Sequence, residues 1–434
     1  MILIYTERNT NRISYTCQVL FTHILKTDWK ITTSVADIRD HTGATITYGE
    51  SEVEADINIP QGKFLLERTI EDVEPEKGTW NDLITLFPIE GQVPFDLFAA
   101  TFYLVSRYEE YLPYKADSQG RFQAEESFAF KNGFLAEPLI DQWAMVLKKA
   151  ILEISPESVF GTREFQHIST VDIDSAFAYR YKGFMRTLGG FAKDLLAVNV
   201  KNARSRCATI LGLAADRYDT YEELIRLHKE YGVSGVFFFL LADYGHNDKN
   251  VPHTSDRYKL TIKRLSDYFE IGIHPGYMSN SEPERLPQEI SRLSDVSKVD
   301  VVNSRQHFLM VRMPQTYQRL LENDIQNDYS MGFASQLGFR MSTCSAVPWY
   351  NIKAEQITPL MLHPFPVMDA TLNMYLQLSP TEAVEAVKPL IEKVRAVDGT
   401  FMTLWHNESL SDIWQWKGWK HVLKDIIRLT SSKT

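Results

Sequence analysis

Cysteines and long apolar runs are both scarce in this sequence. Cys17, Cys207 and Cys344 are the only thiols in 434 residues, too few and too scattered for a disulfide framework or a zinc ribbon. No stretch approaches the roughly 20 uninterrupted apolar residues of a transmembrane helix. The start of the chain, MILIYTERNTNR, lacks the basic and then apolar pattern of a signal peptide. We therefore expect reduced thiols, no membrane span and a cytoplasmic location.

An excess of basic residues is also missing. The chain has 46 Lys and Arg against 56 Asp and Glu, which gives a net charge of −10. A general nucleic-acid binder or a general binder of anionic membranes would need a basic surface. We expect no nucleic-acid partner, although a local basic patch stays open. The 44% hydrophobic and 24% charged residues are ordinary for a globular protein and leave the oligomeric state open.

Motifs of three common enzyme classes do not occur. No G-x-G-x-x-G follows the strand-like run at Thr170, and no G-x-x-x-x-G-K-[ST] is present, which argues against dinucleotide and phosphate-loop sites. No G-x-S-x-G is present either, so a serine nucleophile on a sharp strand-to-helix turn has no support.

The first third of the chain mixes strand-like and helix-like stretches. MILIYT predicts a strand, and apolar residues at helical spacing predict helices over residues 94–114 and 138–154. The cluster SPESVFGTR at residues 155–163 is rich in turn formers and indicates a boundary. We expect an N-terminal α/β domain of unknown role at residues 1–160 and a second domain at residues 161–434.

In the second part, short apolar runs alternate with amphipathic segments. The apolar runs are HISTVDI, VSGVFFFLLA, EIGIH, VDVVNSRQHF, ITPLMLH and GTFMTLWH. Such alternation predicts parallel strands with helical crossovers. About six units fit a barrel of TIM type or a reduced relative, and a doubly wound open sheet is the alternative. Ser379 and Glu382 predict a capping box, and Pro389 should kink or interrupt the helix that follows.

Polar residues close most of these apolar runs. They are Asp172, Asp174, His274, Arg305, His307, His363 and His406. Active sites of parallel α/β folds form at the carboxyl ends of the strands, so one convergent site is expected. Taken singly, each residue also has an ordinary interpretation as a helix cap, a hydrogen-bonded histidine or a surface ion pair.

The residue types predict metal-assisted hydrolysis. Asp172 and Asp174 are two residues apart, which places both carboxylates on one face of a strand, where they repel unless a cation or a proton lies between them. One Asp and two His form the O/N ligand set of a catalytic divalent metal. A second carboxylate and a further His would then supply the base and the acid.

Several of these segments resemble the motifs of the polysaccharide deacetylase (NodB-homology) family. TVDIDS (170–175) is similar to its first motif, EIGIHPGYMS (270–279) to its histidine motif and SRQHF (304–308) to its arginine motif. NDYSMG (327–332) and TLWHN (403–407) resemble the last two. The resemblance covers residues 166–419 and implies a distorted, incomplete (β/α) barrel. It is nearest to a divergent branch with an N-terminal extension, associated with surface-polysaccharide synthesis.

The resemblance also implies roles for individual residues. Asp172 would be the catalytic base, Arg305 would orient it, and His406 would be the general acid. Asp174 and His274 would bind the metal, for which Zn²⁺ is the first candidate. The second metal histidine of the family is replaced by Met278, a poor ligand for such cations, and we expect His307 to take its place.

Four further residues in or beside the motifs are expected to bind substrate: His363, Asp328, Tyr277 and Trp405. The leading hypothesis is a metal-dependent enzyme that removes N- or O-acetyl groups from a carbohydrate, with a lipid-linked, nucleotide-linked or other internal glycan as substrate. The alternatives are a glycosidase, in which two carboxylates flank the cleaved bond, and an inactive sugar-binding protein. The tryptophans at 414, 416 and 419 could stack on sugars but are more often core residues.

Overall fold

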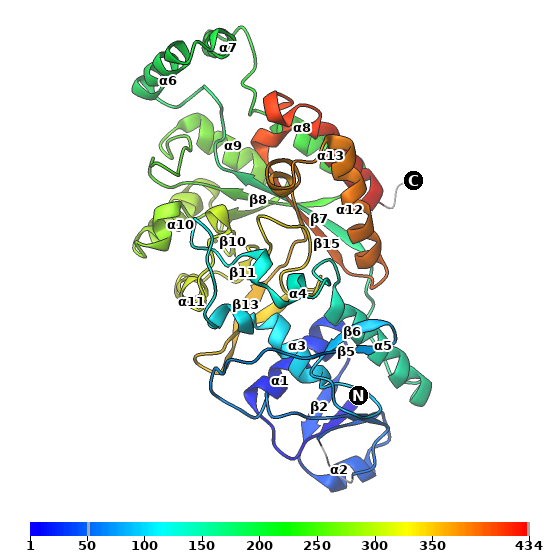
Figure 1. Ribbon diagram of the computed structural model, residues 1–434. Coiled ribbons are helices and arrows are strands. Elements are labelled where there is room, and N and C mark those ends of the chain that lie inside the picture. The colour runs from blue at the N-terminus through cyan, green and yellow to red at the C-terminus, as the bar shows by residue number, and fades with distance from the viewer. Residues whose placement is uncertain (50–52, 432–434) are drawn as a thin grey trace.

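The computed structural model describes residues 1–49 and 53–431, and its N-terminal part contains a small parallel sheet (Figure 1). The strand order is β2-β1-β3-β4, with β1 at Ile2–Tyr5, β2 at Trp29–Thr32, β3 at Thr45–Tyr48 and β4 at Ile57–Ile59. All residues of β1 and β3 are buried, as expected for parallel strands covered on both faces. The strand predicted at the start of the chain is confirmed.

Helices and a hairpin complete this part of the chain. They are α1 (Asn11–Cys17), α2 (Val35–Asp40), α3 (Leu97–Val105), α4 (Phe128–Lys131) and α5 (Leu139–Ile154), with the antiparallel hairpin β5 (Lys77–Trp80) and β6 (Leu83–Leu86). The helix predicted over residues 138–154 is therefore confirmed as α5.

The helix predicted over residues 94–114 is shorter than expected. α3 ends at Val105, and Arg107 adopts a left-handed backbone conformation with φ of 54° before a 3-10 turn at Tyr108–Tyr111. Its guanidinium lies 2.8 Å from Glu109 and 2.7 Å from Glu110. The chain turns at this point and buries the guanidinium beside the two carboxylates. The helical periodicity of the apolar residues could not reveal this turn.

A nine-stranded sheet forms the second part, in the order β12-β13-β11-β10-β9-β8-β7-β15-β14. The strands are β7 (Gln166–Ile173), β8 (Ser234–Phe239), β9 (Glu270–Ile273), β10 (Asn303–Ser304), β11 (Asn327–Asp328), β12 (Val347–Asn351), β13 (Gln356–Leu362), β14 (Val367–Met368) and β15 (Thr400–His406). Every neighbouring pair is parallel except β12 and β13.

The parallel strands follow one another across the sheet in an order close to that of the chain. The chain proceeds from β7 stepwise to β13, and the last strand, β15, returns beside the first, β7. Within the described residues no ladder joins β13 to β14, so the sheet is open at that point and no closed barrel is formed. The predicted mixed α/β architecture with a mainly parallel sheet is confirmed.

Alternate residues of the strands enter two different cores. Val236 and Phe238 of β8 pack with Met402 and Leu404 of β15 in a small cluster, whereas Phe237 and the other odd-numbered neighbours join the large cluster. Because side chains alternate across a strand, the sheet is buried on both faces. The small cluster lies on the same strand faces as Asp172 and His406 and forms a floor beneath them.

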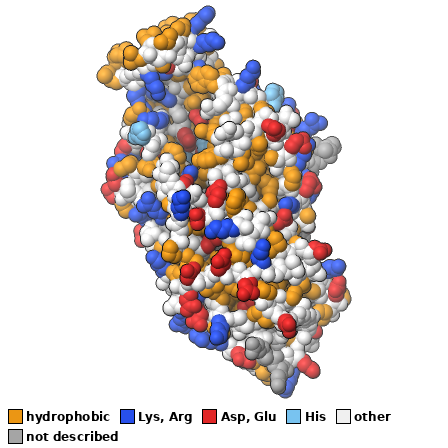
Figure 2. Space-filling view, viewed as in Figure 1, with side chains coloured by type: hydrophobic (Ala, Val, Ile, Leu, Met, Phe, Trp, Pro, Cys, Tyr) orange, Lys and Arg blue, Asp and Glu red, His pale blue; other side chains and the backbone are white. Residues whose placement is uncertain are grey.

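Helices connect these strands. They are α6 (Phe184–Leu196), α7 (Val200–Ile210), α8 (Tyr221–Tyr231), α9 (Asp256–Ser266), α10 (Arg285–Ser297), α11 (Gln315–Glu322), α12 (Pro380–Arg395) and α13 (Trp419–Thr430). α6 and α7 project from the body of the molecule, and apolar side chains gather on them (Figures 1 and 2). Within the described residues, no helix is long and apolar enough to cross a bilayer.

α12 confirms one predicted feature and contradicts another. Ser379 caps its N-terminus in a capping box with Glu382, as the sequence predicted. Pro389 lies inside the helix, which continues through it, so of the predicted kink or interruption the interruption was wrong. Pro389 is exposed, and the carbonyl group that loses its partner can therefore be hydrated by solvent.

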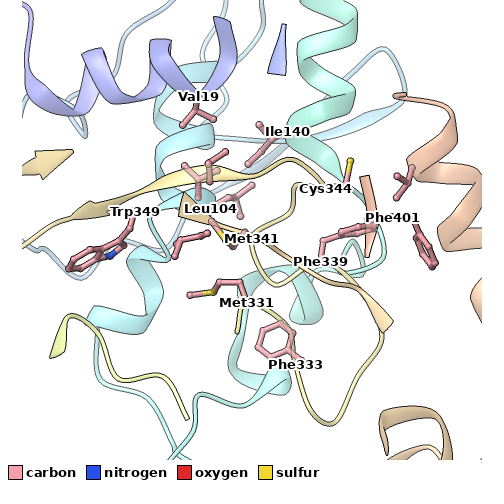
Figure 3. Close-up of a cluster of buried hydrophobic side chains, with 14 of the residues drawn as sticks. Val19, Leu104, Ile140, Met331, Phe333, Phe339, Met341, Cys344, Trp349 and Phe401 are labelled. Atoms are coloured by element: carbon pink, nitrogen blue, oxygen red, sulfur yellow. The ribbon is translucent and has the colours of Figure 1, made fainter. Parts of the chain in front are cut away.

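The N-terminal part and the large sheet share one hydrophobic core. Figure 3 shows Val19, Leu104 and Ile140 facing the same cluster as Met341 and Trp349, which belong to the second part. The Tyr15 hydroxyl also donates a hydrogen bond of 2.8 Å to the carbonyl oxygen of Pro348. The core is therefore continuous across the boundary predicted near residue 160.

Asp141 of α5 is a polar link between the two parts. It is fully buried and accepts hydrogen bonds from Arg163 (2.9 Å), Thr343 (2.6 Å), the backbone N–H of Cys344 (3.0 Å) and Ser345 (2.5 Å). Four donors satisfy this carboxylate away from water. Removing it would take this acceptor from all four donors and leave the Arg163 guanidinium only the Ile24 carbonyl oxygen and Ser345 Oγ.

We expect Asp141→Ala to lower the free energy of unfolding by about 3–5 kcal/mol, the usual loss when one member of a buried ion pair is removed. Urea titration followed by circular dichroism measures it. Glu153→Ala on the same helix is the control, because its ion pair with Lys149 is long, at 4.0 Å, and exposed. A loss below about 1 kcal/mol for Asp141→Ala would show that this network is dispensable.

Candidate metal centre and active site

The carboxyl ends of the strands bring the predicted polar residues to one edge of the large sheet. Asp172 is in β7 and Asp174 follows it, His274 follows β9, His307 follows β10, and His406 is the last residue of β15. β9 and β15 are on either side of the β7–β8 pair, so segments more than 200 residues apart in the chain meet there.

Asp174, His274 and His307 form a cluster of possible metal ligands. One donor atom of each lies within 4.8 Å of those of the other two. His274 Nε2 is 3.2 Å from Asp174 Oδ1, and His307 Nε2 is 3.6 Å from Asp174 Oδ2. These are the three residues that the sequence predicted as metal ligands. Their donor set, a carboxylate and two imidazoles, suits zinc and other first-row divalent cations.

The second ring nitrogen of each histidine is already engaged. His274 Nδ1 lies 2.6 Å from the carbonyl oxygen of Arg305, and His307 Nδ1 lies 3.0 Å from Asp248 Oδ1. A carbonyl or carboxylate partner requires Nδ1 to carry the hydrogen, which leaves the Nε2 lone pair directed toward Asp174 in the neutral ring. Both rings are thus held in the tautomer that binds a metal through Nε2.

The electrostatics of this cluster also favour a cation. Burial lowers the pKa of His307, but the carboxylates of Asp174 and Asp248 outweigh burial and raise it to about 9. Burial raises the pKa of Asp174, yet His307 and His274 bring it well below its usual value. Asp174 Oδ1 is buried and accepts no hydrogen bond within the described residues. These surroundings favour a positive charge, which a proton on His307 or a divalent ion would supply, and a divalent ion fits the residues present.

Arg305 lies beneath Asp172 and is fully buried. Its guanidinium carbon lies over the rings of Phe238 and Phe365, 5.0 and 4.9 Å from their centroids. Nη1 is 3.8 Å from Asp172 Oδ1, and none of its side-chain nitrogens has a hydrogen-bond partner within the described residues. Its charge thus acts on Asp172 Oδ1, while Asp172 Oδ2 lies 3.8 Å from His274 Nε2.

His406 is oriented by Asp369. Asp369 Oδ1 lies 2.8 Å from His406 Nδ1, and its other oxygen accepts from the backbone N–H of His406 at 2.7 Å. Nε2 then points toward Asp174, 4.0 Å away. Burial lowers the pKa of His406, but Asp369, Asp174 and Asp172 raise it well above its usual value. The surroundings of this ring therefore favour its protonated form.

Asp248 and Asp369 were not predicted from the sequence. Both are buried carboxylates that position a histidine, as second-layer partners of metal and catalytic histidines commonly do. A signal for Asp369 existed, because it directly follows the short apolar strand β14. Asp248 lies in a polar loop nine residues beyond the end of β8, and no spacing rule would have selected it.

A cavity of about 230 Å³ opens over these groups. Polar residues on its wall include Asp172, Asp174, His274, His307, His406, Gln306, Glu408 and Arg121, and its aromatic wall consists of Phe308, Tyr375 and Trp416. Aromatic faces beside hydrogen-bonding groups are typical of sites that take amphipathic ligands such as sugars.

Arg121 comes from the N-terminal part of the chain. Its guanidinium donates to the carbonyl oxygen of Phe308 (2.9 Å) and to the Tyr375 hydroxyl (3.2 Å), and it pairs with Asp117 at 2.7 Å. Phe308, directly after His307, has a left-handed backbone with φ of 59°, which is unfavourable for a side chain of this size. Arg121 thus supports the turn that positions His307, a role for the N-terminal part that the sequence did not suggest.

The four residues predicted to bind substrate lie outside the described lining of this cavity. His363 stacks on Tyr329, with 4.4 Å between the ring centroids, and Nε2 lies 2.9 Å from Asn327 Oδ1. Burial and the charge of Arg305 lower the pKa of His363 to about 4. The centroid of the Tyr277 ring lies 5.8 Å from that of Phe308, which belongs to the aromatic wall.

Asp328 and Trp405 are further from solvent. Asp328 is fully buried and accepts hydrogen bonds from Tyr317 (3.2 Å) and Ser330 (2.9 Å). Trp405 is also fully buried and packs 6.4 Å from the ring of Trp419. Direct substrate contact is not supported for either residue. Met278, at the position of the family's second metal histidine, is 40% exposed and lies outside the donor cluster of the described residues.

Comparison with known proteins yields weak likenesses. The sequence pattern of a family of unknown function, DUF7033, matches residues 2–156, and no curated protein matches the chain. A structure described as a polysaccharide deacetylase from Mycobacterium smegmatis has 15% identity and a TM-score of 0.40, over 63% of this chain and 86% of the other. Puue allantoinase has 12% identity and a TM-score of 0.39, over 62% and 84%.

Proposed function

We propose that the protein is a metal-dependent hydrolase that removes acetyl groups from a carbohydrate, built on an opened (β/α) barrel of the NodB-homology type. The observation that supports this most is the convergence of two aspartates and three histidines from four strand ends on one cavity. Asp174, His274 and His307 would hold the cation, and Asp172 and His406 remain for proton transfer. Zn²⁺ is the first candidate for that cation.

The cation and the surrounding side chains would have separate roles in the reaction. When bound, the cation supplies Lewis-acid activation of water and of the acetyl carbonyl group. Asp172 is the base that accepts the proton of the attacking water, and Arg305 orients this carboxylate. His406, kept protonated by Asp369, donates a proton to the departing sugar nitrogen or oxygen. The aromatic wall and Arg121 position the sugar.

The glycosidase alternative is less well supported. A glycosidase needs two carboxylates on opposite sides of the cleaved bond, but Asp172 and Asp174 both face one nitrogen, His274 Nε2, at 3.8 and 3.2 Å. This arrangement suits a shared cation better than an intervening glycosidic bond. Release of acetate, as opposed to a shortened sugar, separates the two reactions.

Metal analysis of protein purified without chelator tests the proposal. Wild type should contain close to one equivalent of divalent metal and release acetate from acetylated sugars. His307→Ala should bind the metal about 100-fold more weakly or worse, since loss of a ligand exceeds the effect of losing a second-layer partner. Met278→Ala is the matched control and should retain the metal. Equal metal in His307→Ala would refute the role of His307, and no metal in wild type after addition of zinc, cobalt or nickel would favour the inactive sugar-binding alternative.

A further inference from the structure

The helical hairpin of α6 and α7 exposes an unusual amount of apolar side chain. Leu196 is 87% exposed, Val198 80%, and Phe184 and Leu213 79% each. The other exposed apolar residues of this segment are Tyr181, Met185, Leu188, Leu195, Val200, Ile210 and Leu211. Figure 2 shows these side chains gathered on the projecting lobe where Figure 1 places the two helices. A patch of this kind on a folded protein indicates an interaction surface.

The apolar residues follow the helical repeat. Phe184, Leu188 and Leu195 of α6 are spaced by four and seven residues, which places them on one face of the helix. A neighbouring face of α6, about 100° around the helix, carries a contact that holds the hairpin together. Asp194 of α6 is buried and pairs with Arg206 of α7 at 2.8 Å. The hairpin is thus joined by polar groups, and its apolar face is left outside.

The hairpin is firmly attached at its base. Arg186 donates a hydrogen bond of 2.9 Å to the carbonyl oxygen of Asn250, and its guanidinium carbon lies 4.3 Å from the centroid of the Tyr244 ring. Asp216, where the chain leaves the hairpin, accepts from the backbone N–H groups of Ala178 and Tyr179 at 2.7 and 2.9 Å. Asn250 and Tyr244 belong to the loop that also contains Asp248, so the hairpin contacts the loop that reaches His307.

The charge of the segment is opposite to that of the whole chain. Residues 180–213 contain seven basic residues and one acidic residue, a net charge of +6, whereas the whole chain has −10. The basic residues are Arg180, Lys182, Arg186, Lys193, Lys201, Arg204 and Arg206. Lys193, Lys201 and Arg204 are exposed beside the apolar side chains. An amphipathic helix with basic and bulky apolar residues on its surface is the pattern that binds anionic bilayer surfaces.

From the exposed apolar face and this reversed charge, we infer that the α6–α7 hairpin docks the protein on an anionic lipid bilayer, inserting its apolar side chains at the headgroup level. The inference stands apart from the proposed hydrolase activity, since it uses none of the cavity residues. The whole-chain charge argued against general binding to anionic membranes, and the hairpin is the local basic patch that was left open. A second copy docked face to face would bring two segments of +6 together, which disfavours self-association.

Vesicle sedimentation of the full-length protein tests this inference. We expect the protein to sediment with vesicles of phosphatidylcholine mixed with phosphatidylglycerol and to remain largely in solution with phosphatidylcholine alone. Lys201→Ala combined with Arg204→Ala should weaken binding about 25-fold, because each basic residue near the surface changes the binding constant about fivefold. Leu196→Glu combined with Val198→Glu should weaken it about tenfold or more. All four positions are exposed, so the variants should fold, which circular dichroism checks.

Val159→Glu is the control, because Val159 is 78% exposed but lies outside the hairpin. It introduces one acidic charge, against two in the Leu196→Glu, Val198→Glu variant, and should leave vesicle binding unchanged. The inference is overturned if wild type stays in solution with both vesicle types. Sedimentation velocity would then show whether a second copy covers the face, as a dimer, or whether it is free for a protein partner, as a monomer. Unchanged binding of the Leu196→Glu, Val198→Glu variant would also overturn it.

Discussion

Asp172→Asn is expected to keep its divalent cation at wild-type stoichiometry while losing about 10²–10⁴-fold of its turnover. The amide has nearly the shape of the carboxylate but cannot accept a proton at neutral pH. Arg305, 3.8 Å from Asp172 Oδ1, would still pack against its two aromatic rings. Metal analysis and acetate release, measured on the same preparation, give the two results side by side.

Asp174→Ala should behave in the opposite way with respect to metal. It removes the one carboxylate whose two oxygens face His274 and His307, at 3.2 and 3.6 Å, so both metal and turnover should be lost. Asp425→Asn, at an exposed position of α13, is the control for loss of a carboxylate alone. Substantial turnover in Asp172→Asn would contradict the role of Asp172 as the base. Full metal content in Asp174→Ala would contradict the role of Asp174 as a metal ligand.

His406→Gln should lower kcat by about 10²–10⁴-fold with little change in metal content. His406 lies outside the donor cluster of Asp174, His274 and His307, and its raised pKa suits a proton donor. The loss should be smaller for substrates whose leaving group needs less protonation, such as an acetyl ester of a phenol. His421→Gln, an exposed histidine on α13, is the matched control.

Asp369→Asn should have an intermediate effect. The amide can still meet the backbone N–H of His406, now 2.7 Å from Asp369 Oδ2, but it no longer holds a charge beside Nδ1. We expect kcat to fall by about 10–100-fold, the usual cost of losing such a partner. An equal kcat in wild type and His406→Gln on sugar substrates would contradict the assignment of the acid, whatever Asp369→Asn does.

Much of the site could be predicted because parallel strands end at a common edge. Asp172, Asp174, His274, His307 and His406 each close or follow an apolar run, and the structure brings all five to one cavity. The position of Trp405 could also have been predicted. It precedes His406 in β15, so the two side chains point to opposite faces of the sheet, and only His406 reaches the cavity.

Other parts of the site depend on long-range packing. Asp248 reaches His307 from a loop, and Arg121 reaches Phe308 from 187 residues away in the chain. Neither contact has a local signal, because a loop's path is decided by what it packs against. The shared core around Trp349 and Leu104 (Figure 3) also depends on long-range packing. An apolar residue in the sequence predicts burial, but it does not predict which residues will surround it.

The sequence by itself determined the alternation of strands and helices, the capping box of α12 and the residues that end the strands, because periodicity and capping are local properties of the chain. Only the tertiary structure decided that the sheet is open between β13 and β14, that the N-terminal part contributes Arg121 to the cavity, and that α6 and α7 leave their apolar face outside. These features depend on which surfaces meet in space, and local sequence patterns hold no information about that choice.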